Sequence, residues 1–180
     1  MLKEALWLLL ILILPTHALA QEQRSPYAGE QTRDIKALSA DEVRAYLTGQ
    51  GAGLAKAAEL NRYPGPLHVL ELAQQLRLTE TEKAKTEQVR AAMLKDATRL
   101  GKLIVEKESE LDKLFAAGKI DEAQLRSRVA EISKLQGELR VTHLRAHLEM
   151  MRVLTPEQTK KYAELRGYES AGSQHEGHPH

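Results

Sequence analysis

Two histidines in the C-terminal half of this 180-residue chain have the types and spacing best suited to chemistry. His143 and His147 are four residues apart, so both imidazoles share one face if the segment is helical. Imidazole nitrogens, joined by a carboxylate or a thioether, form a ligand set for zinc, nickel, cobalt or copper. The same pair could instead be polar core residues that are hydrogen bonded to a carboxylate or to the backbone. Both interpretations stay open at the level of sequence.

Three other side chains are candidates to complete such a site: Glu82, Met150 and His68. On a helix, Met150 lies at about −20° and His147 at about +40° from His143, so all three point the same way. Glu82 belongs to the segment that we expect to pack opposite them. We therefore predict that His143, His147 and Glu82 converge, with Met150 and His68 nearby. The alternative for Glu82 is that it only caps its own helix.

The C-terminal segment, residues 169–180, carries a second histidine cluster made of His175, His178 and His180. A histidine-rich tract can bind metal weakly without a preformed cavity. It can equally be a solvated terminus with no function. No obligatory cofactor is expected in either case, and a divalent transition metal is the one ligand that these residue types suggest.

Composition and motifs exclude several other classes of protein. Cysteine is absent, which rules out disulfides, thiolate metal ligands and a cysteine nucleophile. The chain contains no Gly-x-Ser-x-Gly, Walker or His-Glu-x-x-His motif, so we predict that it is not an enzyme. A formal net charge of +1 argues against nucleic acid as a partner.

The elements that must position these residues are helices. Apolar residues recur at three- and four-residue steps over residues 79–116 and again over 121–153, and Gly118 lies between the two stretches. This pattern predicts an all-α fold built on a long antiparallel helical hairpin. Short helices are expected over residues 39–47, 54–60, 67–76 and 156–166. The whole should form a cradle-like arrangement with four helices. The apolar stripe of so thin a hairpin needs a cover, either from the short helices or from a second copy. We expect both covers, and hence a homodimer.

The remaining segments divide the chain into five parts. Residues 1–20 read as a signal peptide, with Lys3, an apolar run over residues 6–14 and an Ala-x-Ala end at Ala20. That run is about half the roughly 20 residues that span a bilayer, so we expect export to a periplasm without stable membrane insertion. Residues 21–37 are predicted to be a flexible leader, 38–66 short helices and a turn, 67–168 the hairpin domain, and 169–180 the tail.

Two copies of one short motif support the hairpin. Leu78, Thr79 and Glu82 form one copy, and the other is Leu154, Thr155, Pro156, Glu157 and Gln158. Each copy reads as a capping box, in which the threonine hydroxyl and the acid or amide three residues later satisfy free backbone N–H groups. The midpoint between the copies is residue 116, beside the Gly118 turn. The sequence thus predicts that both motifs meet at the same end of the hairpin.

On these motifs, over roughly residues 66–168, the chain resembles the Spy/CpxP family of periplasmic stress proteins, which includes related periplasmic heavy-metal sensor and resistance proteins. Glu82 departs from the family motif, which usually has Gln there. The resemblance implies an all-helical, often dimeric cradle without enzymatic activity. It implies two alternative functions. The function we expect first is that of a non-enzymatic envelope-stress protein with ATP-independent, chaperone-like binding of unfolded or partner proteins, modulated by metal. The alternative is a heavy-metal sensor or resistance protein that signals to a membrane-bound partner.

Overall fold

The computed structural model describes residues 24–168, and the predicted signal peptide and the histidines of the predicted tail lie outside them. The described part contains helices and no strand, which confirms the predicted fold class. In chain order the elements are the 3-10 helix η1 (Glu30–Thr32), α1 (Ala40–Thr48), α2 (Lys56–Glu59), α3 (Pro66–Glu71), α4 (Glu80–Ala116), α5 (Glu122–Val153) and α6 (Pro156–Leu165). Among residues 24–168 no helix is long and apolar enough to cross a membrane.

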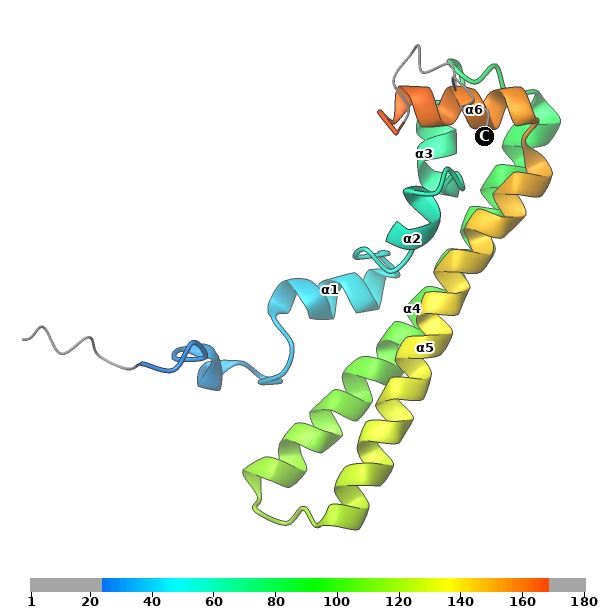
Figure 1. The fold of residues 1–180 in the computed structure, drawn as a ribbon. Coiled ribbons are helices and arrows are strands. Elements are labelled where there is room, and N and C mark those ends of the chain that lie inside the picture. The colour runs from blue at the N-terminus through cyan, green and yellow to red at the C-terminus, as the bar shows by residue number, and fades with distance from the viewer. Residues whose placement is uncertain (1–23, 169–180) are drawn as a thin grey trace, which may run out of the picture. The chain divides into compact units, whose positions relative to one another are not determined.

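The long helices α4 and α5 form the predicted antiparallel hairpin (Figure 1). Gly118 adopts φ +62° in the connection, and Asp121 opens α5 with a complete capping box to Gln124. The core between the two helices is built from small and branched apolar side chains at the predicted period: Ala97, Leu100, Ile104 and Leu139. The hairpin is therefore a direct product of its hydrophobic period and its caps.

Helix α1 packs across α4 at a point where there is no room for a side chain. A Cβ added at Gly101 would overlap the backbone carbonyl of Tyr46 in α1. A capping box opens the helix at Ser39, with the Ser39 hydroxyl accepting from the Glu42 N–H at 3.2 Å, and Gly49 ends the helix at φ +68°. Gly101 thus fixes where the N-terminal helices rest on the hairpin.

Two stretches of the N-terminal half differ from the sequence pattern. The helix expected over 67–76 ends at Glu71, and residues 72–77 form turns that end at Arg77 with φ +53°. Leu76 in this turn is buried in one apolar cluster with Met150 of α5 and Tyr162 of α6. Near the hairpin tip, Ile35 is buried and Lys36 forms an ion pair with Asp112 at 3.2 Å. The last residues of the segment predicted to be a leader therefore contact the hairpin.

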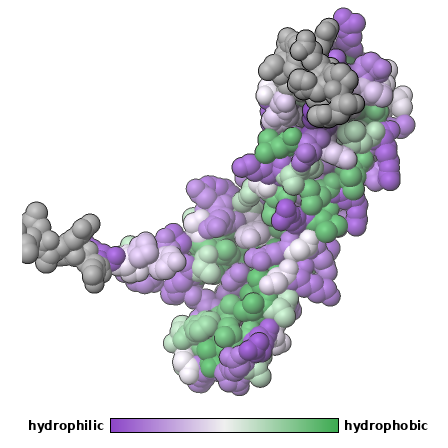
Figure 2. Space-filling view, in the orientation of Figure 1, coloured by the Kyte–Doolittle hydropathy of each residue, from purple (hydrophilic) through white to green (hydrophobic). Residues whose placement is uncertain are grey.

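Apolar side chains also remain on the surface. Figure 2 shows an apolar band on the visible face of the hairpin, bordered by hydrophilic residues. Large exposed apolar side chains of α5 include Val129, Val141, Leu148 and Met151. The short N-terminal helices cover one side of the hairpin and leave this face of α5 open.

Candidate functional site

A cavity of about 860 Å³ lies where α2, α3 and the loop of residues 49–53 meet the two long helices. Its polar lining consists of three imidazoles, one carboxylate and two cations, from His68, His143, His147, Glu59, Lys56 and Arg90. Apolar side chains such as Leu60, Met93 and Leu94 supply much of the rest. The volume is that of a small-ligand site. Five residues were predicted to form the site, and three of them, His68, His143 and His147, line this cavity.

His143 is the most enclosed polar group in this cavity. Its side chain is 3% exposed, and its Nε2 atom is buried without a hydrogen-bond partner. Burial, and the nearby His147, lower the pKa of His143 below its usual value of 6.5, so the ring is neutral at pH 7. Buried polar atoms in proteins nearly always have a partner, because leaving one unpaired is costly. The Nε2 atom of His143 is therefore available as a binding atom for a ligand.

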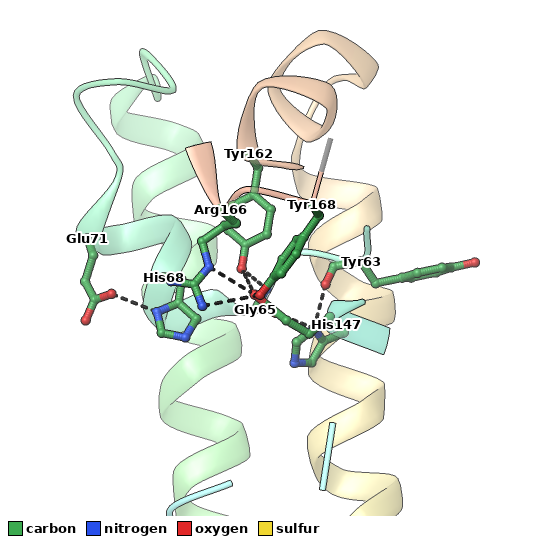
Figure 3. Close-up of polar contacts among 9 residues, drawn as sticks. Tyr63, Gly65, His68, Glu71, His147, Tyr162, Arg166 and Tyr168 are labelled. Carbon is green, nitrogen blue, oxygen red and sulfur yellow. Dashed lines mark hydrogen bonds and ion pairs between the residues drawn. The ribbon is translucent and has the colours of Figure 1, made fainter. Parts of the chain in front are cut away.

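His147 is held by its other ring nitrogen. Nδ1 lies 2.8 Å from the carbonyl oxygen of Tyr63 (Figure 3). A carbonyl can only accept, so Nδ1 carries the proton and, in the neutral ring, Nε2 keeps its lone pair. This is the arrangement by which metal-binding histidines are commonly oriented. A Cβ at Gly65 would come within 3.0 Å of the His147 ring, so Gly65 makes the space for it.

The Glu59 carboxylate, which is not among the residues predicted from the sequence, connects the cavity to the end of α6. Its Oε1 atom accepts from the hydroxyl of Tyr162 at 2.5 Å, the hydroxyl of Tyr168 at 3.0 Å and Nε of Arg166 at 3.3 Å. Figure 3 shows these three side chains converging beside His147. Oε2 lies 3.7 Å from Nδ1 of His147. Burial, and the hydrogen bond to Glu59, raise the pKa of Tyr162 far above its usual value.

Glu59 was missed because α2 has only four residues and no hydrophobic period to place it. A weaker signal was present on its partners. Tyr162 and Arg166 are one helical turn apart and Tyr168 follows two residues later, so three polar side-chain ends gather on one side of α6. Such a cluster indicates a buried carboxylate nearby, although it does not say which one.

Glu82 does not line the cavity, so its predicted convergence with the histidines is not what the structure shows. Its carboxylate accepts from the backbone N–H of Thr79 at 2.8 Å and from Nε2 of Gln158 at 3.1 Å. These hydrogen bonds lower the pKa of Glu82. Glu82 caps α4, as the alternative interpretation had it, and also binds the residue that caps α6. The predicted meeting of the two motifs is thereby confirmed.

The other motif residues serve this junction. Thr155 and Gln158 form a complete capping box with Pro156 in the first turn of α6, while Leu154 is buried and Leu78 packs against the same apolar cluster. Glu157 lies on the surface of that first turn. Gln158 Nε2 also approaches the carbonyl of Leu76 at 3.4 Å. Glutamate at position 82, where the related motif has glutamine, gives the Gln158 amide a charged acceptor.

Met150 and His68 have different surroundings. The Met150 side chain is fully buried among Val69, Leu76, Leu154 and Tyr162, away from the cavity lining. His68 lines the cavity, but its Nδ1 lies 2.8 Å from the carboxylate of Glu71 on the same helix. The five predicted residues thus divide into a histidine group at the cavity and two residues, Glu82 and Met150, that hold the hairpin end together.

The residues at the cavity fit part of a metal site. The neutral His147 ring offers the lone pair of Nε2, and His143 offers a ring nitrogen without a hydrogen-bond partner; imidazole nitrogens suit borderline transition metals. Within residues 24–168, however, no group of three histidine or carboxylate side chains is arranged to hold an ion. Protein zinc sites use at least three ligands, so two imidazoles make an incomplete set.

Comparison with known proteins gives one result. A protein-family model described as heavy-metal resistance matches residues 5–161, which is most of the chain. Neither the curated proteins nor the solved structures gave a match.

Proposed function

The chain belongs to the heavy-metal resistance family, and from this premise we propose that it is a periplasmic, non-enzymatic protein that binds a divalent transition metal and reports it. The observation that carries the proposal is the buried, unpartnered Nε2 of His143 beside His147 in the cavity. A bound ion would supply the missing partner of that nitrogen. The family description independently supports metal rather than an organic ligand.

The folded protein prepares two imidazoles, those of His143 and His147, to act as metal ligands. Burial keeps His143 neutral, and the Tyr63 carbonyl, 2.8 Å from Nδ1, orients His147 so that its Nε2 is left for an ion. Metal binding requires neutral imidazole, so little free energy is needed to prepare His143 as a ligand near pH 7. Zinc, nickel, cobalt and copper all accept such nitrogen ligands.

A metal sensor must pass the information that metal is bound to another protein. We propose that this partner is a membrane-bound signalling protein. The cavity joins α2 and α3 to the long helix α5, so an ion held there restrains the short helices against the hairpin. A restrained and an unrestrained N-terminal region are two states that a partner can distinguish. This sensor function stands ahead of the chaperone alternative because the family description concerns metal.

The chaperone-like alternative keeps one observation in its favour, the exposed apolar side chains of α5. Apolar patches of this kind bind protein surfaces. We assign the face first to a second copy of this chain, as the homodimer prediction requires. An aggregation-suppression assay without ATP, run with and without chelator, separates the two functions: suppression that ignores metal supports the chaperone.

The proposal is tested by titrating zinc, nickel, cobalt and copper into the purified mature protein by calorimetry. We expect His143→Ala and His147→Ala each to weaken binding by at least about tenfold. Thr142→Ala is the matched control, because Thr142 precedes His143 on the same helix and lies outside the cavity lining. Equal affinity in all four proteins would contradict the proposal.

A further inference from the structure

The cavity is much larger than a metal ion needs. Its volume is about 860 Å³. A water molecule takes up about 30 Å³ in the liquid, so an ion with a few waters would fill only a small part of this space. Cavities of about 300–1,000 Å³ are the size of sites that hold small organic molecules. The volume therefore indicates that an organic molecule enters the cavity with the metal.

The two cations of the cavity lining have no anionic partner. Among residues 24–168, neither Lys56 nor Arg90 forms an ion pair with a carboxylate. Glu59 supplies the carboxylate of the lining, and its Oε1 atom already accepts from Arg166 at 3.3 Å. A dication held in the same cavity as two unpaired cations is electrostatically unfavourable unless an anion accompanies it. The charges thus favour a ligand that is negatively charged.

The elements that supply these cations also supply apolar side chains. On α4, Met93 and Leu94 follow Arg90 by three and four residues, so the three side chains share one helix face, and all of them line the cavity. Lys56 opens α2, and Leu60, also in the lining, follows one turn later. A cation and an apolar surface one turn apart suit a ligand with a carboxylate and an apolar body.

The same kind of ligand would complete the metal coordination. His143 and His147 offer two imidazole nitrogens in this cavity, and protein zinc sites are typically four-coordinate. A carboxylic acid with a nitrogen or a hydroxyl group on the neighbouring carbon chelates a metal through two atoms, which brings the donors to four. Volume, charge and donor number therefore agree on one class of molecule.

We propose that the cavity binds the metal together with a small chelating organic acid, such as an α-amino or α-hydroxy acid with an apolar body. The carboxylate is attracted by Lys56 and Arg90, the apolar body packs on Met93 and Leu94, and the chelating atoms share the ion with the two histidines of α5. The inference rests on the proposed function, because it names the form in which the metal is recognised. The bound species is then a metal complex rather than a free ion.

Equilibrium dialysis of the purified protein tests this with nickel and radiolabelled picolinate, an aromatic carboxylate that chelates through its ring nitrogen. Isonicotinate is the matched probe, because it has the same charge and size but its nitrogen lies too far from the carboxylate to chelate. We expect picolinate to bind at least about tenfold more tightly with nickel present than without it, at one picolinate per nickel. Isonicotinate should show no such gain.

The variant Lys56→Gln/Arg90→Gln removes both cations and keeps polar side chains in their place. It should weaken the binding of picolinate with nickel by at least about tenfold, because a charge-assisted contact to the carboxylate is lost. Its affinity for nickel alone should be no weaker than that of wild type, since only positive charge has been removed. Lys95→Gln/Arg99→Gln, which removes two exposed cations of α4 outside the cavity lining, is the control and should behave as wild type.

The outcomes separate this inference from the proposed function. Nickel binding to wild type without any gain for picolinate would overturn the inference and leave the proposed function intact. Equal binding of picolinate and isonicotinate, with or without nickel, would indicate a simple anion site and would also overturn the inference. A gain for picolinate that survives in Lys56→Gln/Arg90→Gln would overturn the assigned place of the carboxylate. No binding of nickel, either alone or with picolinate, would overturn both proposals.

Discussion

Burial decides the charge of single residues at this site, and His143 is the clearest case. The folded protein lowers the pKa of this imidazole below 6.5 because the charged form would be desolvated and would lie near His147. In the unfolded chain the same ring has its ordinary pKa. As pH falls below about 6.5, the unfolded state therefore takes up more protons at this position than the folded state does.

The resulting prediction is that His143 makes the protein less stable in mild acid. The free energy of unfolding should be undiminished by this residue above about pH 6.5 and should fall as the pH drops through the lowered folded-state pKa. Urea unfolding at pH 7.5 and 5.5 measures the loss. His143→Gln, which cannot titrate, should lose less stability than wild type over that interval, and an equal loss would show that His143 is not the group responsible.

The orientation of single side chains could be predicted from the sequence where the residues belong to a long helix with a regular apolar period. The four-residue step between His143 and His147 and the surrounding apolar stripe correctly indicated that both rings point inward. The prediction failed for Glu82, because a carboxylate at the third position of a helix has a nearby backbone N–H as a competing partner. Glu59 could not be predicted, since its neighbours Tyr162 and Arg166 are about a hundred residues away in sequence.

Two kinds of contact join the helices of this protein. In one, a side chain that caps one helix also hydrogen bonds to the side chain that caps another. In the other, two helix backbones approach each other closely. The Glu82 carboxylate is the shared cap, because it closes the first turn of α4 and accepts from the Gln158 side chain that closes α6. Gly101 is the point of close backbone approach, where the Tyr46 carbonyl of α1 packs against α4. Each makes a prediction about stability.

Replacing Glu82 should destabilise the hairpin end according to what the new side chain can accept. Glu82→Ala removes the cap and leaves the Gln158 amide without this acceptor, with an expected loss of about 1 kcal/mol or more. Glu82→Gln keeps an amide oxygen for both donors and should lose much less. Urea unfolding of the three proteins checks the order, and an equal loss for both variants would contradict this account of the junction.

Gly101→Ala and Gly137→Ala make a matched pair of helix-interior substitutions. A Cβ at position 101 overlaps the Tyr46 carbonyl, whereas nothing lies within 4 Å of a Cβ at position 137. Alanine should stabilise at position 137 by up to about 1 kcal/mol through helix propensity. At position 101 we expect a loss of about 1–3 kcal/mol, because α1 must move away from α4. Thermal unfolding of both variants measures the difference, and two shifts of the same sign would refute the close crossing.

Some helix ends in this protein can be predicted from the local sequence, and others cannot. The capping boxes at Ser39, Thr79, Asp121 and Thr155 are all present, because each is closed by residues three apart in sequence. The helix α3 ends earlier than its sequence indicates, since burial of Leu76 against Tyr162 and Met150 turns the chain. That contact is tertiary and leaves no local signal.

At the scale of the whole molecule, the open face of α5 is the feature that needs a partner. Val141, Leu144, Leu148 and Met151 follow one another at steps of three and four residues, and all of them except the half-buried Leu144 are exposed. This is the spacing of a helix-to-helix seam. It supports the homodimer that we propose as the working form of the protein.

Sedimentation should therefore find a dimer in the micromolar range. Leu148→Lys should shift it to monomer without loss of helical content, because a charge would be buried in the seam. Glu138→Lys, exposed on a neighbouring face of the same helix, is the control and should leave the dimer intact. A wild-type protein that stays monomeric up to millimolar concentration would contradict the assignment of this face.

Anomalous diffraction from zinc- or nickel-loaded crystals shows whether a metal binds between His143 and His147. We expect an anomalous peak in the cavity, about 2.0–2.1 Å from Nε2 of both His143 and His147 for zinc. A peak found only elsewhere, with the Nε2 atom of His143 still buried and unpartnered, would rule out this metal site.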